Sequence, residues 1–112
     1  MSQINHHMFR GNDIRGLAGT ELTPASAELI GKAIGTYLLR NGCKKREAIV
    51  GQDCRLSSPE LSTALIAGLR STGINVKDIG LASWGFVNYA LRQEAGNAVF
   101  VSASHNPPEY NG

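Results

Sequence analysis

The sequence predicts an α/β fold, with a three-layer α/β/α arrangement around a mostly parallel, mixed sheet. Short apolar segments alternate along the chain with longer segments whose apolar residues recur at helical spacing. Both of the longer helical segments carry start and stop signals in the correct order. Glycine accounts for 13 of the 112 residues, above the usual share of about 7 % and typical of a chain with many tight turns. Strands that alternate with helices pair in parallel through right-handed crossovers.

The first helix is expected over residues 23–42. Thr23 is a candidate N-cap, Pro24 suits the first helical position, and Gly42 is placed to end the helix. The apolar residues of this segment fall on one helical face: Ala27, Ile30, Ala33, Ile34, Tyr37 and Leu38. An amphipathic helix of this kind packs that face against a core.

Residues 47–51 predict a buried strand, because they form a short apolar run bounded by charged residues. A second helix follows, with Ser57 or Ser58 as its N-cap and Gly73 at its end. Apolar and polar residues alternate over 74–80, which predicts a strand with one solvated face.

Three shorter segments complete the expected fold. Residues 86–94 can form a short helix, and the apolar run 98–101 predicts a further buried strand. Residues 8–10 can supply one more short strand, followed by a loop over residues 11–19.

Composition bounds the classes of function. A chain of 112 residues can form one soluble domain with an ordinary core. Lys and Arg number 11 against 9 Asp and Glu, and aromatic residues make up 6 %, so no nucleic-acid partner is expected. The sequence has neither a membrane-length apolar stretch nor a secretory signal, so we expect no membrane partner and a cytoplasmic location. Cys43 and Cys54 fit that compartment as structural or incidental thiols.

Two polar segments stand at expected strand ends, where α/β sheets bind ligands. Residues 102–112 follow the apolar strand and are rich in Ser, His, Asn and Pro, which suits a held nucleophile or a phosphate-binding loop. Composition alone favours a simple turn, because adjacent Ser and His side chains usually diverge. Residues 9–16 place two arginines and an aspartate between glycines, and arginine forks suit phosphate oxygens. Taken alone, this segment is best interpreted as an exposed loop.

Considered together, these segments resemble the α-D-phosphohexomutase superfamily, in particular its bacterial phosphomannomutase/phosphoglucomutase branch. Residues 102–107, Ser-Ala-Ser-His-Asn-Pro, are similar to the phosphoserine loop of that family. Residues 9–16 are similar to its Tyr-Asp-Ile-Arg-Gly signature, and residues 51–55 to its Gly-Arg-Asp-x-Arg strand end. The order and spacing of the three motifs agree over nearly the whole chain, which favours the functional interpretation of both loops.

The resemblance implies that Ser104 carries a phosphoryl group and transfers it to a hexose 1- or 6-phosphate of mannose or glucose. Arg15 and His105 are implied as further catalytic residues, Arg15 by steadying the loop and its charge and His105 by positioning or proton transfer. Asn12 and Asn106 are implied as substrate contacts, although the family often has Tyr where this chain has Asn12. Mg²⁺ is the implied cofactor, with a phosphate oxygen on Ser104 as one ligand, and hexose 1,6-bisphosphate is the implied activator and intermediate.

The same resemblance implies that residues 1–112 are the first of four domains, incomplete at the C-terminus. The expected partners are hexose phosphates and the remaining domains, which would supply the catalytic Lys and the other Mg²⁺ ligands. Residues 1–112 alone are expected to be inactive, and to self-associate or to be only modestly stable. Two alternatives stay open: a non-catalytic module that binds sugar phosphates or a protein, and, more weakly, a serine hydrolase, since Ser104 lacks the Gly-x-Ser-x-Gly context.

Overall fold

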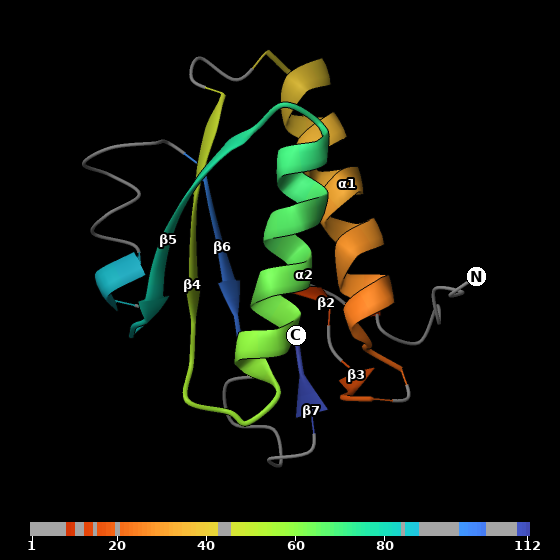
Figure 1. The fold of residues 1–112 in the computed structure, drawn as a ribbon, viewed down its shortest axis with the longest axis vertical. Coiled ribbons are helices and arrows are strands. Elements are labelled where there is room, and N and C mark those ends of the chain that lie inside the picture. The colour runs from red at the N-terminus through yellow and green to blue at the C-terminus, as the bar shows by residue number, and fades with distance from the viewer. Residues whose placement is uncertain are drawn as a thin grey trace.

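The computed structural model describes residues 9–10, 13–14, 16–19, 21–42, 46–83, 85–87, 97–102 and 110–112. Its elements, in chain order, are β1 (Phe9–Arg10), β2 (Asp13–Ile14), β3 (Gly16–Leu17), α1 (Pro24–Arg40), β4 (Glu47–Gln52), α2 (Ser58–Ser71), β5 (Asn75–Leu81), β6 (Ala98–Val101) and β7 (Tyr110–Asn111). Figure 1 shows α1 and α2 side by side next to the sheet, with the helical turn 85–87 on the other side of it. No helix of the described part is both long and apolar enough to cross a membrane.

The main sheet has the strand order β5-β4-β6, and both of its strand pairs are parallel. Antiparallel pairs among the described strands belong to two separate two-stranded sheets, β1-β2 and β3-β7. The predicted α/β class is therefore confirmed. The short strand expected at residues 8–10 forms as β1, but it pairs with β2 outside the main sheet, and β2 and β3 occupy part of the stretch expected to be a loop.

Local signals predicted the helix starts well. Thr23 caps α1 in a reciprocal capping box, in which its N–H donates to Ser26 Oγ at 2.8 Å and its Oγ1 accepts from the Ser26 N–H at 3.1 Å. Ser57 is the N-cap of α2, but its side chain makes no capping hydrogen bond. Gly42 and Gly73 follow the two helices with φ values of +67° and +97°, which glycine adopts without strain.

The core lies between the two helices and one face of the sheet. Its buried members are Leu22, Ala27, Val50, Leu61, Leu65, Ile66, Leu69 and Val101. The opposite face of β4 meets the turn 85–87, because a Cβ added at Gly51 would lie 2.7 Å from Val87 Cγ2. Helical turns therefore cover both faces of β4, as expected for α/β/α layers. Of the helix expected at 86–94, only residues 86 and 87 lie within the described residues, and they belong to the helical turn 85–87.

The predicted apolar face of α1 was partly wrong. Tyr37 is 65 % exposed and Ala33 is exposed, whereas Gly31 and Gly35 are buried. The reason is close packing: a Cβ at Gly31 would collide with the Leu65 carbonyl oxygen of α2. The helices approach each other along glycines, so the largest apolar side chains of α1 do not all define its buried face.

The predicted alternation of the strand at 74–80 also breaks down in β5. The register between β4 and β5 shifts between Val50 and Gly51, so Asp78 lies opposite Val50 and Gly80 lies opposite Gly51. Lys77 and Asp78 are consecutive and both exposed, while Ile79 and Gly80 are both half-buried. An irregularity that inserts one residue removes strict alternation from the strand that contains it.

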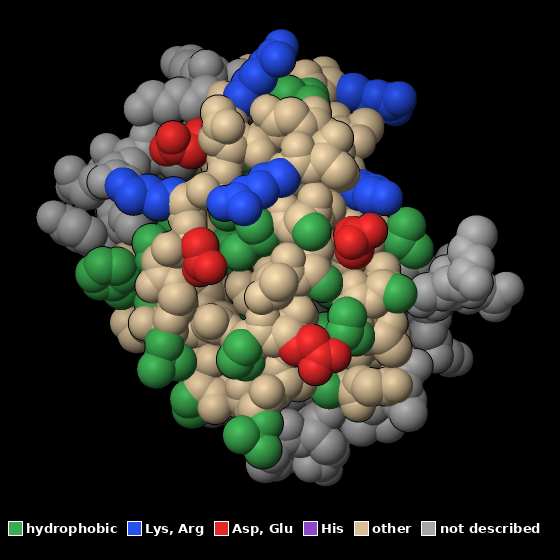
Figure 2. Space-filling model, viewed as in Figure 1, with side chains coloured by type: hydrophobic (Ala, Val, Ile, Leu, Met, Phe, Trp, Pro, Cys, Tyr) green, Lys and Arg blue, Asp and Glu red, His purple; other side chains and the backbone are tan. Residues whose placement is uncertain are grey.

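Figure 2 shows the side of the molecule seen in Figure 1, where the helix pair lies beside the sheet, and Lys and Arg side chains on it are interspersed with Asp and Glu. Lys32 and Glu28 form one such pair along α1, with Nζ and Oε2 3.6 Å apart. Both side chains are 47 % exposed, so the pair contributes little to stability. This face is a solvated helix surface of mixed charge.

The helix contact supplies a stability test. Gly68→Ala is expected to lower the free energy of unfolding by about 2 kcal/mol, because overpacking outweighs the gain in helix propensity of about 1 kcal/mol. The added Cβ would collide with the Glu28 carbonyl oxygen and lie 2.9 Å from the Lys32 backbone nitrogen. Urea denaturation measures the change, with Ala67→Ser at the neighbouring exposed position as the control. Equal stabilities of the two variants would contradict the close packing.

Candidate functional site

The candidate site lies at the carboxyl edge of the main sheet. β4 and β6 end there, α2 begins there, and β7 lies beside them at the lower end of the view in Figure 1. Loops at this edge of a parallel sheet are where α/β proteins bind ligands. The structure therefore brings together strand and helix ends at the location that the sequence predicted for chemistry.

The residues that the sequence singled out for catalysis lie outside the described residues. These are Ser104, His105 and Arg15, together with the expected substrate contacts Asn12 and Asn106. The structure does describe the residues on either side of them: Ser102 and Tyr110 flank segment 103–109, and Gly16 follows Arg15. The described residues around these segments form a hydrogen-bonded network, which we call the frame. It consists of Asp53, Arg55, Ser57, Ser58, Ser102 and Asn111.

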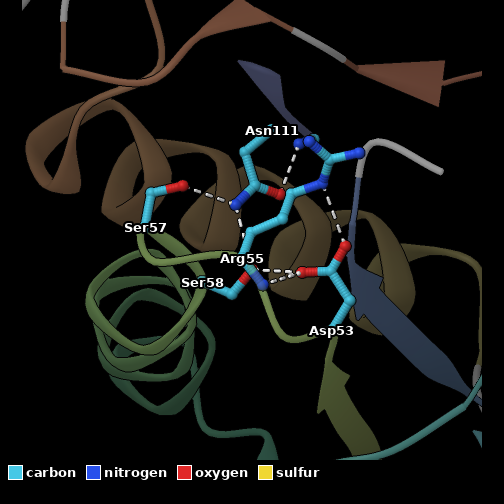
Figure 3. Close-up of polar contacts among 6 residues, drawn as sticks. Asp53, Arg55, Ser57, Ser58 and Asn111 are labelled. Carbon is cyan, nitrogen blue, oxygen red and sulfur yellow. Dashed lines mark hydrogen bonds and ion pairs between the residues drawn. The ribbon is translucent and has the colours of Figure 1, made fainter. Parts of the chain in front are cut away.

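Asp53 is the centre of that frame. Its Oδ1 accepts hydrogen bonds from the Ser58 hydroxyl at 2.6 Å and from the Arg55 backbone N–H at 3.1 Å. Its Oδ2 faces Arg55 Nε at 3.1 Å in an ion pair whose side chains are only 10 % (Arg55) and 19 % (Asp53) exposed. Figure 3 shows the carboxylate of Asp53 in contact with both Ser58 and Arg55. Its backbone N–H donates to the Val101 carbonyl at 3.0 Å, which fixes Asp53 to the end of β6.

The surroundings of Asp53 favour its ionised form. Burial raises the pKa of this carboxyl, but four other influences lower it more: hydrogen bonds from Ser58 and Ser102, the backbone N–H of Arg55 and the charge of its guanidinium. The pKa of Asp53 therefore lies below its ordinary value. The side chain is a carboxylate at neutral pH and can act only as a hydrogen-bond acceptor.

Asn111 of β7 is the second buried member of the frame. It is fully buried, and its Nδ2 donates to Ser57 Oγ at 2.8 Å and to Ser58 Oγ at 3.0 Å. Its Oδ1 accepts from the Gly112 backbone N–H at 2.9 Å. The contacts of the Asn111 amide with the start of α2 are visible in Figure 3. Through them β7 is bound to the first turn of that helix.

Both ends of segment 103–109 are thus attached to the frame. At one end, the Ser102 N–H donates to the Gly112 carbonyl at 2.7 Å and the Ser102 side chain hydrogen-bonds to Asp53. At the other end, Asn111 binds the start of α2 and pairs with Gly16 of β3. The strand that follows Arg15 in the sequence therefore pairs with the strand that follows segment 103–109.

The described residues provide no obvious set of metal ligands. Among them, no group of three His, Cys, Asp or Glu side chains is arranged to hold a metal ion. Both carboxylate oxygens of Asp53 are already engaged, and the adjacent Arg55 guanidinium opposes a second cation. The Mg²⁺ ligand implied for this chain, a phosphate oxygen on Ser104, belongs to a residue outside the described part.

Sequence reasoning missed the roles of Ser102, Ser58 and Asn111 in this frame. The sequence indicates Ser58 only as a candidate helix cap, and Asn111 only as one residue of the polar segment 102–112. The available signal was the Asp-x-Arg spacing at the end of a buried strand, next to a helix start rich in Ser. Such a spacing can place a guanidinium against a carboxylate, but it does not indicate which distant residue completes the network.

A family model described as phosphoglucomutase/phosphomannomutase, alpha/beta/alpha domain I, matches residues 6–112. The chain belongs to this family. Its described fold agrees with the match: a solved phosphoglucomutase/phosphomannomutase family protein from Burkholderia thailandensis superimposes with a TM-score of 0.86 at 36 % identity, covering 98 % of this chain and 26 % of that one.

Relatives of the chain are named as mutases of several kinds. A phosphoglucomutase/phosphomannomutase from Thermococcus kodakarensis is 45 % identical over 94 % of this chain and 23 % of its own length. A phosphoglucosamine mutase from Alkaliphilus metalliredigens is 41 % identical over 94 % of this chain and 23 % of its own. A phosphoglucomutase from Neisseria meningitidis is 39 % identical over 100 % of this chain and 24 % of its own. The chain thus spans about a quarter of the length of these relatives.

The ion pair predicts a pH-dependent stability. At pH 7, Asp53→Asn is expected to lower the free energy of unfolding by about 2 to 3 kcal/mol, less than for a wholly buried pair, because Arg55 loses its ionised partner. The pKa of Asp53 is lower in the folded than in the unfolded chain, so the stabilisation is present above the ordinary carboxyl pKa of about 4 and is lost as the pH falls through the folded pKa.

Urea denaturation of both proteins over a pH series measures this effect. The difference in stability between wild type and Asp53→Asn is expected to shrink as the pH falls below about 4. Asp78→Asn, at an exposed position of β5, is the control and is expected to change the free energy of unfolding by less than about 0.5 kcal/mol. A difference for Asp53→Asn that is constant with pH would contradict the ionised pair.

Proposed function

We propose that residues 1–112 belong to the first domain of a four-domain phosphohexomutase that interconverts hexose 1-phosphates and 6-phosphates. The family match over residues 6–112 carries this proposal, and the catalytic names of the relatives support it. Those relatives are named for glucose, mannose and glucosamine phosphates, so the proposed substrate class is hexose phosphates. Glucose and mannose, the sugars in the name of the matching family model, are proposed first.

In the proposed reaction Ser104 is the phosphoryl carrier. A hydroxyl oxygen of the hexose monophosphate forms a bond to phosphorus as the bond between phosphorus and Ser104 Oγ breaks. The sugar hydroxyl gives its proton to a base, proposed as a Lys beyond Gly112, and Ser104 Oγ regains a proton. The resulting hexose 1,6-bisphosphate turns over in the site and returns its other phosphate to Ser104 by the same steps in reverse.

The other residues of this chain have supporting roles in the proposal. The Arg15 fork holds two phosphate oxygens, His105 positions the loop or moves a proton, and Asn12 and Asn106 contact the sugar phosphate. Mg²⁺, when bound, neutralises charge on the transferring phosphoryl group, and the phosphate on Ser104 is the ligand that this chain contributes.

The frame around Asp53 is consistent with this chemistry. Phosphoryl transfer is catalysed mainly by positioning and charge neutralisation, so the segment that carries the phosphate must be held in place. Ser102 and Asn111, on either side of segment 103–109, both belong to the buried network of Asp53 and Ser58. A rigid attachment of both flanks is what a phosphoserine loop requires.

The proposal predicts that Ser104 is the phosphorylated residue of the complete enzyme. Incubation with glucose 1,6-bisphosphate followed by peptide mass spectrometry is expected to locate the phosphate on Ser104. Ser104→Ala is expected to lose at least a thousandfold in mutase turnover while it keeps its stability, because a loop hydroxyl contributes little packing. Ser71→Ala, at an exposed position of α2, is the control with unchanged turnover.

Two outcomes would contradict this proposal. One is a phosphate on Ser102, Ser57 or Ser58 with none on Ser104. The other is an unphosphorylated enzyme that binds hexose phosphates without converting them, which would instead support the non-catalytic binding module.

A further inference from the structure

We infer that Asp53 is a positioning residue for the segment 103–109, acting through Ser102 at one end of that segment and through Ser58 and Asn111 at the other. The inference rests on the proposed function, in which this segment carries the phosphoserine Ser104. Asp53 itself has no proposed contact with substrate.

The geometry connects Asp53 to both flanks by short paths. Ser102 hydrogen-bonds to Asp53 directly, and its own N–H closes onto the Gly112 carbonyl at 2.7 Å. On the other side, Ser58 Oγ lies 2.6 Å from Asp53 Oδ1 and 3.0 Å from Asn111 Nδ2. Within the described part of the chain, one carboxylate thus joins the residue before the segment to the strand after it.

The charge on Asp53 also sets the direction of the hydrogen bonds. A carboxylate only accepts, so the Ser58 hydroxyl proton points to Asp53, and the oxygen lone pairs of Ser58 are left to accept from the Asn111 amide. With its NH₂ group committed to Ser57 and Ser58, Asn111 presents its carbonyl oxygen to the Gly112 N–H. The ionised state of Asp53 therefore fixes the orientation of a buried side chain on β7.

Asp53→Asn is a sharp test because it keeps the volume of the side chain. The Arg55 backbone N–H approaches Oδ1 and the Arg55 Nε–H approaches Oδ2. If the NH₂ group of the Asn side chain takes the place of Oδ1, it faces the Arg55 backbone N–H. If it takes the place of Oδ2, it faces the Arg55 Nε–H, so in both cases two donors oppose each other. The substitution consequently disrupts the network without opening a cavity, and segment 103–109 loses its fixed base.

For the complete enzyme, we expect Asp53→Asn to lower kcat by at least tenfold with KM for glucose 1-phosphate changed by less than twofold. A loop that carries the reacting phosphate loses rate when it is displaced by about 1 Å, whereas binding of a substrate that Asp53 does not touch is preserved. Asp78→Asn is the matched control: Asp78 is exposed and its Oδ1 accepts one local hydrogen bond, from the Gly80 N–H at 2.9 Å. It is expected to keep both constants.

A second variant, Ser102→Ala, removes one arm of the network and leaves Asp53 ionised. It is expected to lower kcat severalfold, and its effect is expected to be smaller in the Asp53→Asn background than in wild type, because both changes act on the same attachment. This non-additivity in kcat is a readout that general destabilisation of the fold does not produce. Wild type and all variants are assayed at a temperature at which their urea denaturation curves show that each is folded in the absence of urea.

The outcomes distinguish a failure of the positioning role of Asp53 from a failure of the proposed function. A wild-type enzyme that is phosphorylated on Ser104 and active, with kcat of Asp53→Asn equal to that of Asp78→Asn, overturns the positioning role and leaves the proposed function intact. Multiplicative effects of Asp53→Asn and Ser102→Ala on kcat also overturn it, as does an unchanged kcat in Ser102→Ala if Asp53→Asn fails to fold. A wild-type enzyme without Ser104 phosphorylation or turnover overturns the proposed function and this inference together.

Discussion

Asp53, through its paired carboxylate and its backbone, is the point at which four parts of the chain meet: β4, β6, the start of α2 and β7. Asp53 directly follows β4 and is fixed by its backbone to β6, Arg55 precedes α2, and Ser58 connects the carboxylate to β7 through Asn111. A mostly buried charge is tolerated only if it is paired and hydrogen-bonded, so the contacts of the Asp53 carboxylate with Arg55 and Ser58 support one another. Removing the charge of either Asp53 or Arg55 leaves the charge of the other residue unpaired where little solvent reaches it.

The architecture explains why this network lies where it does. Parallel order of β5, β4 and β6 brings their carboxyl ends to one edge, and the α2 helix starts from that edge. Gly31 and Gly68 let α1 approach α2 closely, which holds α2 against the apolar residues of β4 and β6. The first turn of α2 is therefore a fixed platform, and Ser57 and Ser58 on it can bind Asn111. Tight helix packing thus supports the base of the loop that carries the proposed chemistry.

Features set by neighbouring residues could be predicted from the sequence, and features set by distant contacts could not. Thr23 and Pro24 predict the start of α1 from local sequence alone, and the apolar runs at 47–51 and 98–101 correspond to β4 and β6. Tyr37 was misplaced because the burial of α1 depends on a glycine contact with α2.

The candidate site shows the same division. The meeting of the β4 and β6 ends with the start of α2 at one edge of the sheet was predicted correctly, since it follows from strand and helix order. The bonds from Asn111 to Ser57 and Ser58 span 54 and 53 residues of sequence, so no local pattern reveals them. The roles of Ser104, His105, Arg15, Asn12 and Asn106 stay predictions, because these residues lie outside the described part of the structure.

Amide hydrogen exchange at the base of segment 103–109 tests the central claim most directly. The Ser102 N–H donates to the Gly112 carbonyl, so its exchange reports opening of that base, whereas the Leu69 N–H lies in the core helix α2. If Asp53 holds the base closed, Asp53→Asn should accelerate exchange at Ser102 by at least tenfold more than at Leu69, and Asp78→Asn should accelerate neither. Equal acceleration at Ser102 and Leu69 would mean that Asp53 stabilises the fold as a whole, and would contradict the specific attachment of the loop.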